Sequence, residues 1–185
     1  YFIYTSLVLI VSAPFAISFL KPYQKLRILA FFDPERDPLG SGYQIIQSKI
    51  AVGSGGIWGK GFLKGTQNYL EFLPEKHTDF IFTLFSEEFG FLGSLALLLV
   101  YSLMIYRIIL IGTICRSFFA KLYCFGFGSA IFIYVVVNMC MVLGLLPIVG
   151  SPLPIISYGG SSMLATMIGL SIVMSAKIYH RQLIS

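Results

Sequence analysis

Residues 122–176 read LYCFGFGSAIFIYVVVNMCMVLGLLPIVGSPLPIISYGGSSMLATMIGLSIVMSA and contain no charged side chain. A helix of about 20 apolar residues is long enough to cross a bilayer. Prolines and glycines interrupt the middle of the stretch, where a straight helix cannot continue. It therefore predicts two membrane spans, at about 122–146 and 153–176, joined by a short turn.

The whole chain has the composition of a membrane protein. Of its 185 residues, 57% are hydrophobic and 11% are charged, whereas about a quarter of the residues in a soluble domain are charged. The net charge of +5 comes from lysines and arginines scattered over connecting segments, a pattern that orients a chain in a bilayer. We therefore expect an all-α, polytopic helix bundle and no nucleic-acid binding.

The cysteines and the start of the chain add two expectations. Cys115, Cys124 and Cys140 lack metal-ligand spacing, so they are interpreted as small hydrophobic residues and no metal site is expected. The chain starts at Tyr1 without a methionine or a basic n-region. We expect residues 1–185 to be a single membrane domain that forms part of a longer protein.

Three more segments are predicted to cross the membrane. Residues 2–20 and 89–111 are strongly apolar. Residues 43–58 are less so, because Gln44, Gln47, Ser48 and Lys49 interrupt them. A charge that faces lipid is costly, so Lys49 is predicted to line the bundle interior or a wet cavity. Snorkelling or internal pairing of this lysine is the alternative.

Basic residues orient the spans. They mark the connector near 112–121 and the tail: Arg107, Arg116, Lys121, Lys177 and Arg181. The turn at 147–152 has none, so the connector and the tail are predicted to be cytoplasmic. Without a crossing at 43–58, eight basic residues would be exported, against the usual bias. We therefore predict a cytoplasmic loop at 21–42, in which prolines break any helix, and an extracytoplasmic loop at 59–88.

The loop at 59–88 holds the densest group of ionisable residues. Within LPEKHTDFIF at 73–82, Asp79 stands where polar sequence gives way to an aromatic segment. A carboxylate at such a boundary can act as a general base toward a hydroxyl, and capping of the next helix is the alternative. Glu87 and Glu88 are predicted to stabilise that helix through its dipole, or the inner one to enter a cavity.

The segment 144–162 cannot continue a straight span. Irregular backbone near membrane depth must be covered by protein or face water, so we expect this segment to fold back beside an outward cavity. Ser157, Tyr158 and Ser161 are candidates to bind a headgroup there. Capping of the last helix by Ser157 or Ser161 is the alternative.

These stretches together resemble the SEDS family (shape, elongation, division and sporulation) of membrane-embedded peptidoglycan glycosyltransferases. The resemblance rests on motifs that follow in order at 33–43, 47–56, 65–67, 73–82, 87–90 and 144–162. Gly65-Thr66-Gln67 and residues 70–75 are closer to the RodA elongation branch than to the FtsW division branch.

The resemblance implies a ten-helix parent in the bacterial cytoplasmic (inner) membrane, of which this chain is the C-terminal half with about five spans. It implies that lipid II is polymerised into glycan strands during cell elongation, with Asp79 as the essential aspartate and general base. It also implies a class B penicillin-binding protein as partner, docked on residues 89–146.

The departing pyrophosphate would need a cation, for which the candidates are Lys49, Lys60, Lys64 and Lys76. Further candidate substrate-binding residues are Gln67, Glu75, His77, Ser157, Tyr158 and Ser161. No cofactor is specified, and a divalent cation is left open. The alternatives are a lipid II transporter or flippase, suggested by an interior Lys49 and a Pro/Gly-broken span near the tail, and a non-catalytic scaffold for a transpeptidase.

Overall fold

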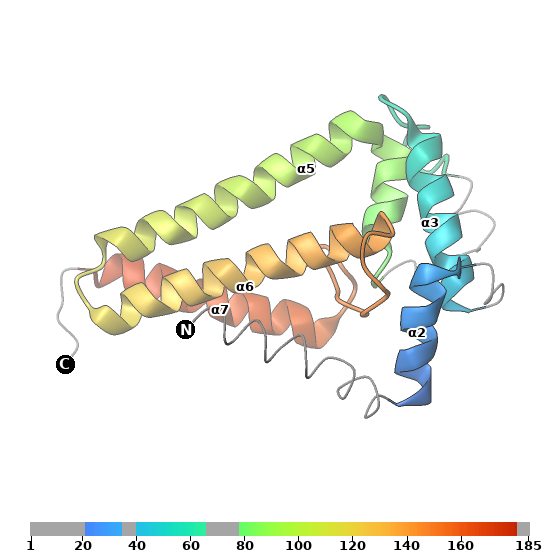
Figure 1. Ribbon diagram of the computed structural model, residues 1–185. Coiled ribbons are helices and arrows are strands. Elements are labelled where there is room, and N and C mark those ends of the chain that lie inside the picture. The colour runs from blue at the N-terminus through green and yellow to red at the C-terminus, as the bar shows by residue number, and fades with distance from the viewer. Residues whose placement is uncertain (1–20, 35–39, 66–77, 181–185) are drawn as a thin grey trace, which may run out of the picture.

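The computed structural model describes residues 21–34, 40–65 and 78–180, and every regular element in these ranges is helical. The helices are α2 (Pro22–Phe32), α3 (Ser41–Gly55), α5 (Ile81–Ile114), α6 (Phe118–Val142) and α7 (Gly160–Ile178) (Figure 1). The predicted all-α class is confirmed.

Three of these helices, α5, α6 and α7, are long and apolar enough to cross a membrane. They correspond to the predicted spans at 89–111, 122–146 and 153–176. The last begins later than predicted, at Gly160, because the proline-rich segment before it forms an irregular loop. The predicted span at 2–20 lies outside the described residues.

Buried apolar side chains hold the three long helices together. Tyr101 and Ile108 of α5 meet Ile131 and Val135 of α6 in one cluster, which Val173 of α7 completes. Most other apolar side chains on these helices are exposed, as expected for surfaces that face lipid. Cys115 and Cys124 are buried free thiols and Cys140 is partly buried, in agreement with their interpretation as small hydrophobic residues.

Helix α5 is broken at Gly90, whose backbone has φ 68° and ψ −162°. The part before the break packs against α3, and the part after it runs along α6 (Figure 1). Because φ lies in the left-handed region, which glycine enters without a steric penalty, this residue permits the change of direction. The break places the beginning of α5 at the end of the bundle where α6 ends and α7 begins.

The sequence predicts a loop without helix at 21–42, and the structure has helix α2 there. Pro22 stands at the start of this helix, where a missing N–H costs nothing. No other proline follows before Pro34, so the helix continues to Phe32. The prediction placed the effect of the prolines too early in the segment.

The predicted crossing at 43–58 would place residues 21–42 and 59–88 on opposite sides of the membrane, whereas in the structure Arg27 and Asp79, one from each segment, both lie at residues 148–150. Arg27 of α2 donates a hydrogen bond from Nη1 to the carbonyl oxygen of Ile148, at 3.2 Å. The carboxylate of Asp79 lies beside Gly150 in the same loop. The two segments thus meet at one end of the bundle, opposite the connector between α5 and α6 (Figure 1).

The predicted crossing at 43–58 is helix α3, which has 15 residues. Its length is about 22 Å, short of a hydrocarbon core of about 30 Å, and it is not among the candidate spans of the described residues. The orientation given to this segment stays a prediction, since the positive-inside rule on which it rests holds for loops of up to about 60 residues. The segment between residue 20 and the break at Gly90 is longer than that.

Candidate functional site

Asp79 lies in a turn immediately before α5 and is partly buried. Asn138, fully buried on α6, holds this turn in place. Its Nδ2 donates to the carbonyl oxygen of Asp79 at 2.9 Å and to that of Ser151 at 2.7 Å. One amide side chain therefore ties the Asp79 turn to the loop that follows α6.

Ser157 makes a second connection to the same turn. Its hydroxyl donates to the carbonyl oxygen of Thr78 and accepts from the backbone N–H of Leu153, both at 2.7 Å. The side chain is buried, so this predicted headgroup ligand serves here to join two loops. The alternative, that Ser157 or Ser161 caps α7, is wrong, because Gly159 is the N-cap and no side chain caps it.

A guanidinium lies near the Asp79 carboxylate. Gly150 has φ 77°, and a Cβ placed on it would lie 3.2 Å from Oδ2 of Asp79 and 4.0 Å from Nη1 of Arg27. Arg27 is itself partly buried and anchored on Ile148. The structure therefore brings an acid and a cation to the same glycine, from segments 52 residues apart in the chain.

Arg27 and Asn138, which contact the Asp79 turn or its surroundings, were not among the residues predicted from the sequence. Asn138 could have been identified from the sequence, because it is the one amide side chain between positions 118 and 142. A polar group inside an apolar span usually has a role. Arg27 gives no such signal. It lies in a segment with several other cations, and only the tertiary contact with residues 148–150 distinguishes it.

Lys60, a predicted cation for the substrate, pairs with an acid of its own chain. Its Nζ lies 2.7 Å from Oε1 of Glu87, whose side chain is 0% exposed. Gly65 packs on the other side of this carboxylate, where a Cβ would lie 3.0 Å from Oε2. Lys60 therefore compensates a buried charge. Glu87 and Glu88 lie just before the break at Gly90, where the longer part of α5 begins, and the dipole role predicted for them there stays a prediction.

Four backbone hydrogen bonds join residues 56–61 to the break in α5. The N–H groups of Lys60 and Gly61 donate to the carbonyl oxygens of Glu87 and Glu88, and those of Phe91 and Leu92 donate to Gly56 and Ile57. These bonds satisfy backbone N–H and C=O groups that have no partner within the helix at the break. A Cβ on Gly90 would lie 2.7 Å from the carbonyl oxygen of Ile57, so this close approach requires glycine.

The other predicted binding residues are dispersed. Lys49 is exposed, with its ammonium over Gly144, where a Cβ would lie 2.6 Å from Nζ. That Lys49 lines the bundle interior or a wet cavity stays a prediction. Lys64 and Ser161 are also exposed. Gln67, Glu75, Lys76 and His77 lie outside the described residues.

Two hollows flank the Asp79 turn and the break. Tyr158 is 80% exposed and lines one of about 560 Å³ together with Ile81, Ser157 and Met163. The other, of about 340 Å³, is almost wholly apolar and lies between α3, the two parts of α5 and the end of α6. Among the described residues, no group of three or more His, Cys, Asp and Glu side chains is placed to hold a metal ion.

Comparison with known proteins gives consistent matches. Residues 1–182 match the family model FTSW_RODA_SPOVE, described as a cell cycle protein. The chain is 52% identical to the peptidoglycan glycosyltransferase MrdB of Escherichia coli K12, over 88% of this chain and 44% of that protein. It is 44% identical to the peptidoglycan glycosyltransferase RodA of Treponema pallidum, over 89% of this chain and 37% of that protein.

A solved structure has the same fold. It was published as "Structural coordination of polymerization and crosslinking by a peptidoglycan synthase complex", and the match has a TM-score of 0.71 and 34% identity over 97% of this chain and 47% of that one. The chain thus spans less than half the length of the curated relatives it matches.

Proposed function

The chain belongs to the family of FtsW, RodA and SpoVE, which is the SEDS family, and is RodA-like; we propose that its full-length protein polymerises lipid II into glycan strands during cell elongation. The observation that carries this proposal is the Asp79 carboxylate, which stands beside the Arg27 guanidinium in a turn bound by α6 and by the loop before α7. Because the chain spans less than half of its relatives, the activity is proposed for the whole protein in the bacterial inner membrane.

In the proposed reaction, Asp79 acts as a general base. Its carboxylate takes the proton of the acceptor sugar's hydroxyl as that oxygen attacks the anomeric carbon of the donor. The new glycosidic bond forms while the bond from the anomeric carbon to undecaprenyl pyrophosphate breaks. The leaving group departs with the electron pair and a further negative charge, so a cation must stand close to it.

Among the cations in the described residues, Arg27 is best placed to stabilise the leaving group. Lys60 already pairs with Glu87, whereas Arg27 lies at the same glycine as Asp79. A guanidinium also suits a phosphate better than an ammonium does, because it offers parallel N–H donors in a fixed plane. Its hydrogen bond to Ile148 keeps that plane in position before the substrate arrives.

The hydrogen bonds around Asp79 support a role that depends on accurate placement. Asn138 and Ser157 bind the backbone of residues 78–79 from α6 and from the loop before α7. A reacting group held on such fixed elements loses little freedom when the substrate binds. The partner proposed for the exposed apolar faces of α5 and α6 is a class B penicillin-binding protein, in line with the peptidoglycan synthase complex that the fold resembles.

A transporter of lipid II is less well supported than an enzyme. Its support in the sequence is an interior Lys49 and a Pro/Gly-broken span near the tail; the broken segment is present before α7, but Lys49 is exposed in the described structure. Reconstitution of the full-length protein in liposomes with lipid II distinguishes the two functions. We expect Asp79→Asn to lower the rate of glycan polymerisation by about 10²–10⁴-fold, and we expect no transfer of lipid II between leaflets by the wild type. Transfer without polymer in the wild type would instead establish a transporter.

A further inference from the structure

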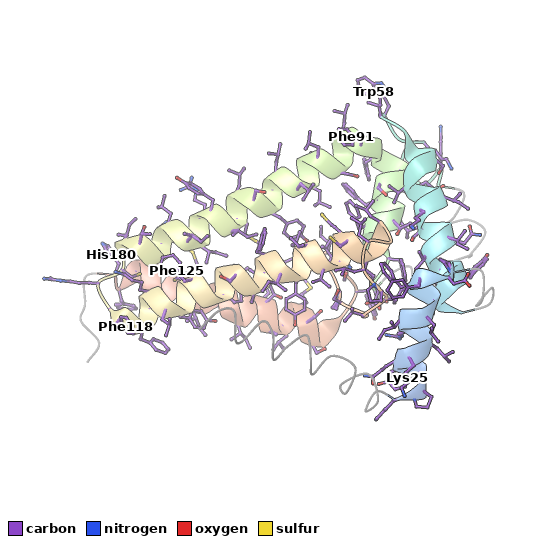
Figure 2. The ribbon with its side chains drawn as sticks, in the orientation of Figure 1. Lys25, Trp58, Phe91, Phe118, Phe125 and His180 are labelled. Carbon is purple, nitrogen blue, oxygen red and sulfur yellow. The ribbon has the colours of Figure 1, made fainter. Side chains whose placement is uncertain are left out.

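Basic side chains from three helices converge at the end of the bundle opposite Asp79. A hollow of about 550 Å³ lies between α5 and α7 and has Arg107, Lys177 and His180 among its lining residues. A second hollow, of about 520 Å³, has Arg116, Lys121 and the same His180. Figure 2 shows His180 at this end of the molecule, near Phe118 at the start of α6. We call the two together the basic hollow.

The long helices provide no counter-charge to these cations. Arg107, Arg116, Lys121 and Lys177 are exposed, and no aspartate or glutamate occurs in the sequence after Glu88. The positive-inside rule accounts for the side of the membrane on which such residues lie. It does not account for their convergence on two hollows that share His180.

The backbone around the basic hollow is fixed by contacts between the connector and α7. The N–H of Arg116 donates to the carbonyl oxygen of His180 at 3.0 Å, and Sγ of Cys115 donates to that of Ala176 at 3.4 Å. Nδ1 of His180 lies 2.8 Å from the carbonyl oxygen of Lys177. The hollow is therefore a feature of the packed bundle and not of a loose tail.

The larger hollow is lined by apolar side chains as well as by its basic residues. Leu110, Ile111 and Ile114 of α5 face Met174 of α7. This combination matches a phospholipid, whose phosphate would meet the cations while the first carbons of its chains meet the wall. Basic pockets between membrane helices on the cytoplasmic side bind anionic headgroups in this manner.

From this geometry we infer that the basic hollow binds an anionic phospholipid of the cytoplasmic leaflet through its phosphate. The site is separate from the Asp79 turn and does not depend on the proposed enzymatic function. It would hold the cytoplasmic ends of α5 and α7 together with the start of α6, since each contributes a cation to the same ligand.

Lipid binding by the purified full-length protein tests this inference. The protein in detergent is titrated with phosphatidylglycerol or with phosphatidylcholine, and bound lipids are counted by native mass spectrometry. We expect phosphatidylglycerol to bind preferentially. Since each basic residue near a membrane surface contributes about 1 kcal/mol, the double variant Arg107→Gln/Lys177→Gln should weaken that binding about thirtyfold.

Two controls keep the result interpretable. Lys25→Gln/Lys64→Gln removes the same charge from the other end of the molecule and should leave phosphatidylglycerol binding unchanged. Arg107→Lys/Lys177→Arg keeps the charge at the hollow and should retain binding even if the glutamine variant folds poorly. Equal binding of both lipids, or an equal loss in the Lys25→Gln/Lys64→Gln control, would overturn the inference.

Discussion

At the scale of single residues, the site depends on which cation stands beside Asp79. Sequence reasoning distributed this role over four lysines, because charge and proximity in the chain were the only criteria available. The structure adds that Lys60 is paired with a buried acid and that Arg27 lies at Gly150 with Asp79. Contacts between distant segments favour Arg27 among the cations of the described residues, and no local pattern encodes these contacts.

Arg27→Ala in the full-length protein should lower kcat for lipid II polymerisation by about a hundredfold, the usual effect of removing one group that stabilises developing charge. Arg27→Lys should restore part of that loss, since an ammonium keeps the charge without the planar pair of donors. Steady-state kinetics with purified lipid II checks both values. The matched control is Lys25→Ala on the same helix. An Arg27→Ala enzyme with unchanged kcat would remove Arg27 from the site.

The position of Asp79 was more predictable than its surroundings. Its motif at 73–82 singled it out, and the sequence correctly expected irregular backbone at 144–162. Asn138 and Ser157 then show why these two segments matter to each other, since both hydrogen-bond the backbone of residues 78–79. That pairing joins positions 59 and 79 residues apart, which periodicity cannot reveal.

At the scale of elements, the junction between residues 56–61 and the break in α5 orients the site. Hydrophobic periodicity predicted α5, α6 and α7 because each is a long apolar run. It did not predict the break, since one glycine in such a run is ordinary and its φ depends on the loop that packs against it. Helix α2 was missed because two prolines beyond its end were given too much weight.

The pair of the partly exposed Lys60 and the buried Glu87 should be needed for this junction. Lys60→Met leaves a fully buried carboxylate without its cation, which typically costs about 3–5 kcal/mol. The double variant Lys60→Met/Glu87→Gln should recover much of that loss, because it removes the charge as well as its partner. Denaturation of the full-length protein in detergent measures both free energies of unfolding. Lys64→Met, on an exposed residue nearby, is the control, and an equal effect of Lys60→Met and Lys64→Met would contradict the proposed role.

At the scale of the whole molecule, the structure places residues 21–34 and the Asp79 turn at the same end of the bundle. Three long helices lie beside one another, and α2, α3 and the first part of α5 gather at one end of them (Figure 1). We propose that the whole segment from Lys21 to the break at Gly90 lies on the outer side. Residues 1–20 would then provide the preceding span, as the sequence predicts.

Chemical labelling in intact cells tests this arrangement. A cysteine at position 25, introduced as Lys25→Cys into a variant with its native cysteines replaced, should react with a membrane-impermeant maleimide added outside. Lys177→Cys should react only after the membrane is permeabilised, because the tail lies at the opposite end. Labelling of position 25 only after permeabilisation would restore the crossing at 43–58.

The most direct test of the central claim is the rate of glycan polymerisation by the full-length protein that carries Asp79→Asn. This substitution keeps the shape of the side chain and the backbone hydrogen bond from Asn138, and it removes the base. With purified lipid II and a sample that unfolds like the wild type, we predict a loss of about 10²–10⁴-fold, the range that general base catalysis contributes. Polymer formed at the wild-type rate would contradict the assignment of Asp79 as the catalytic base.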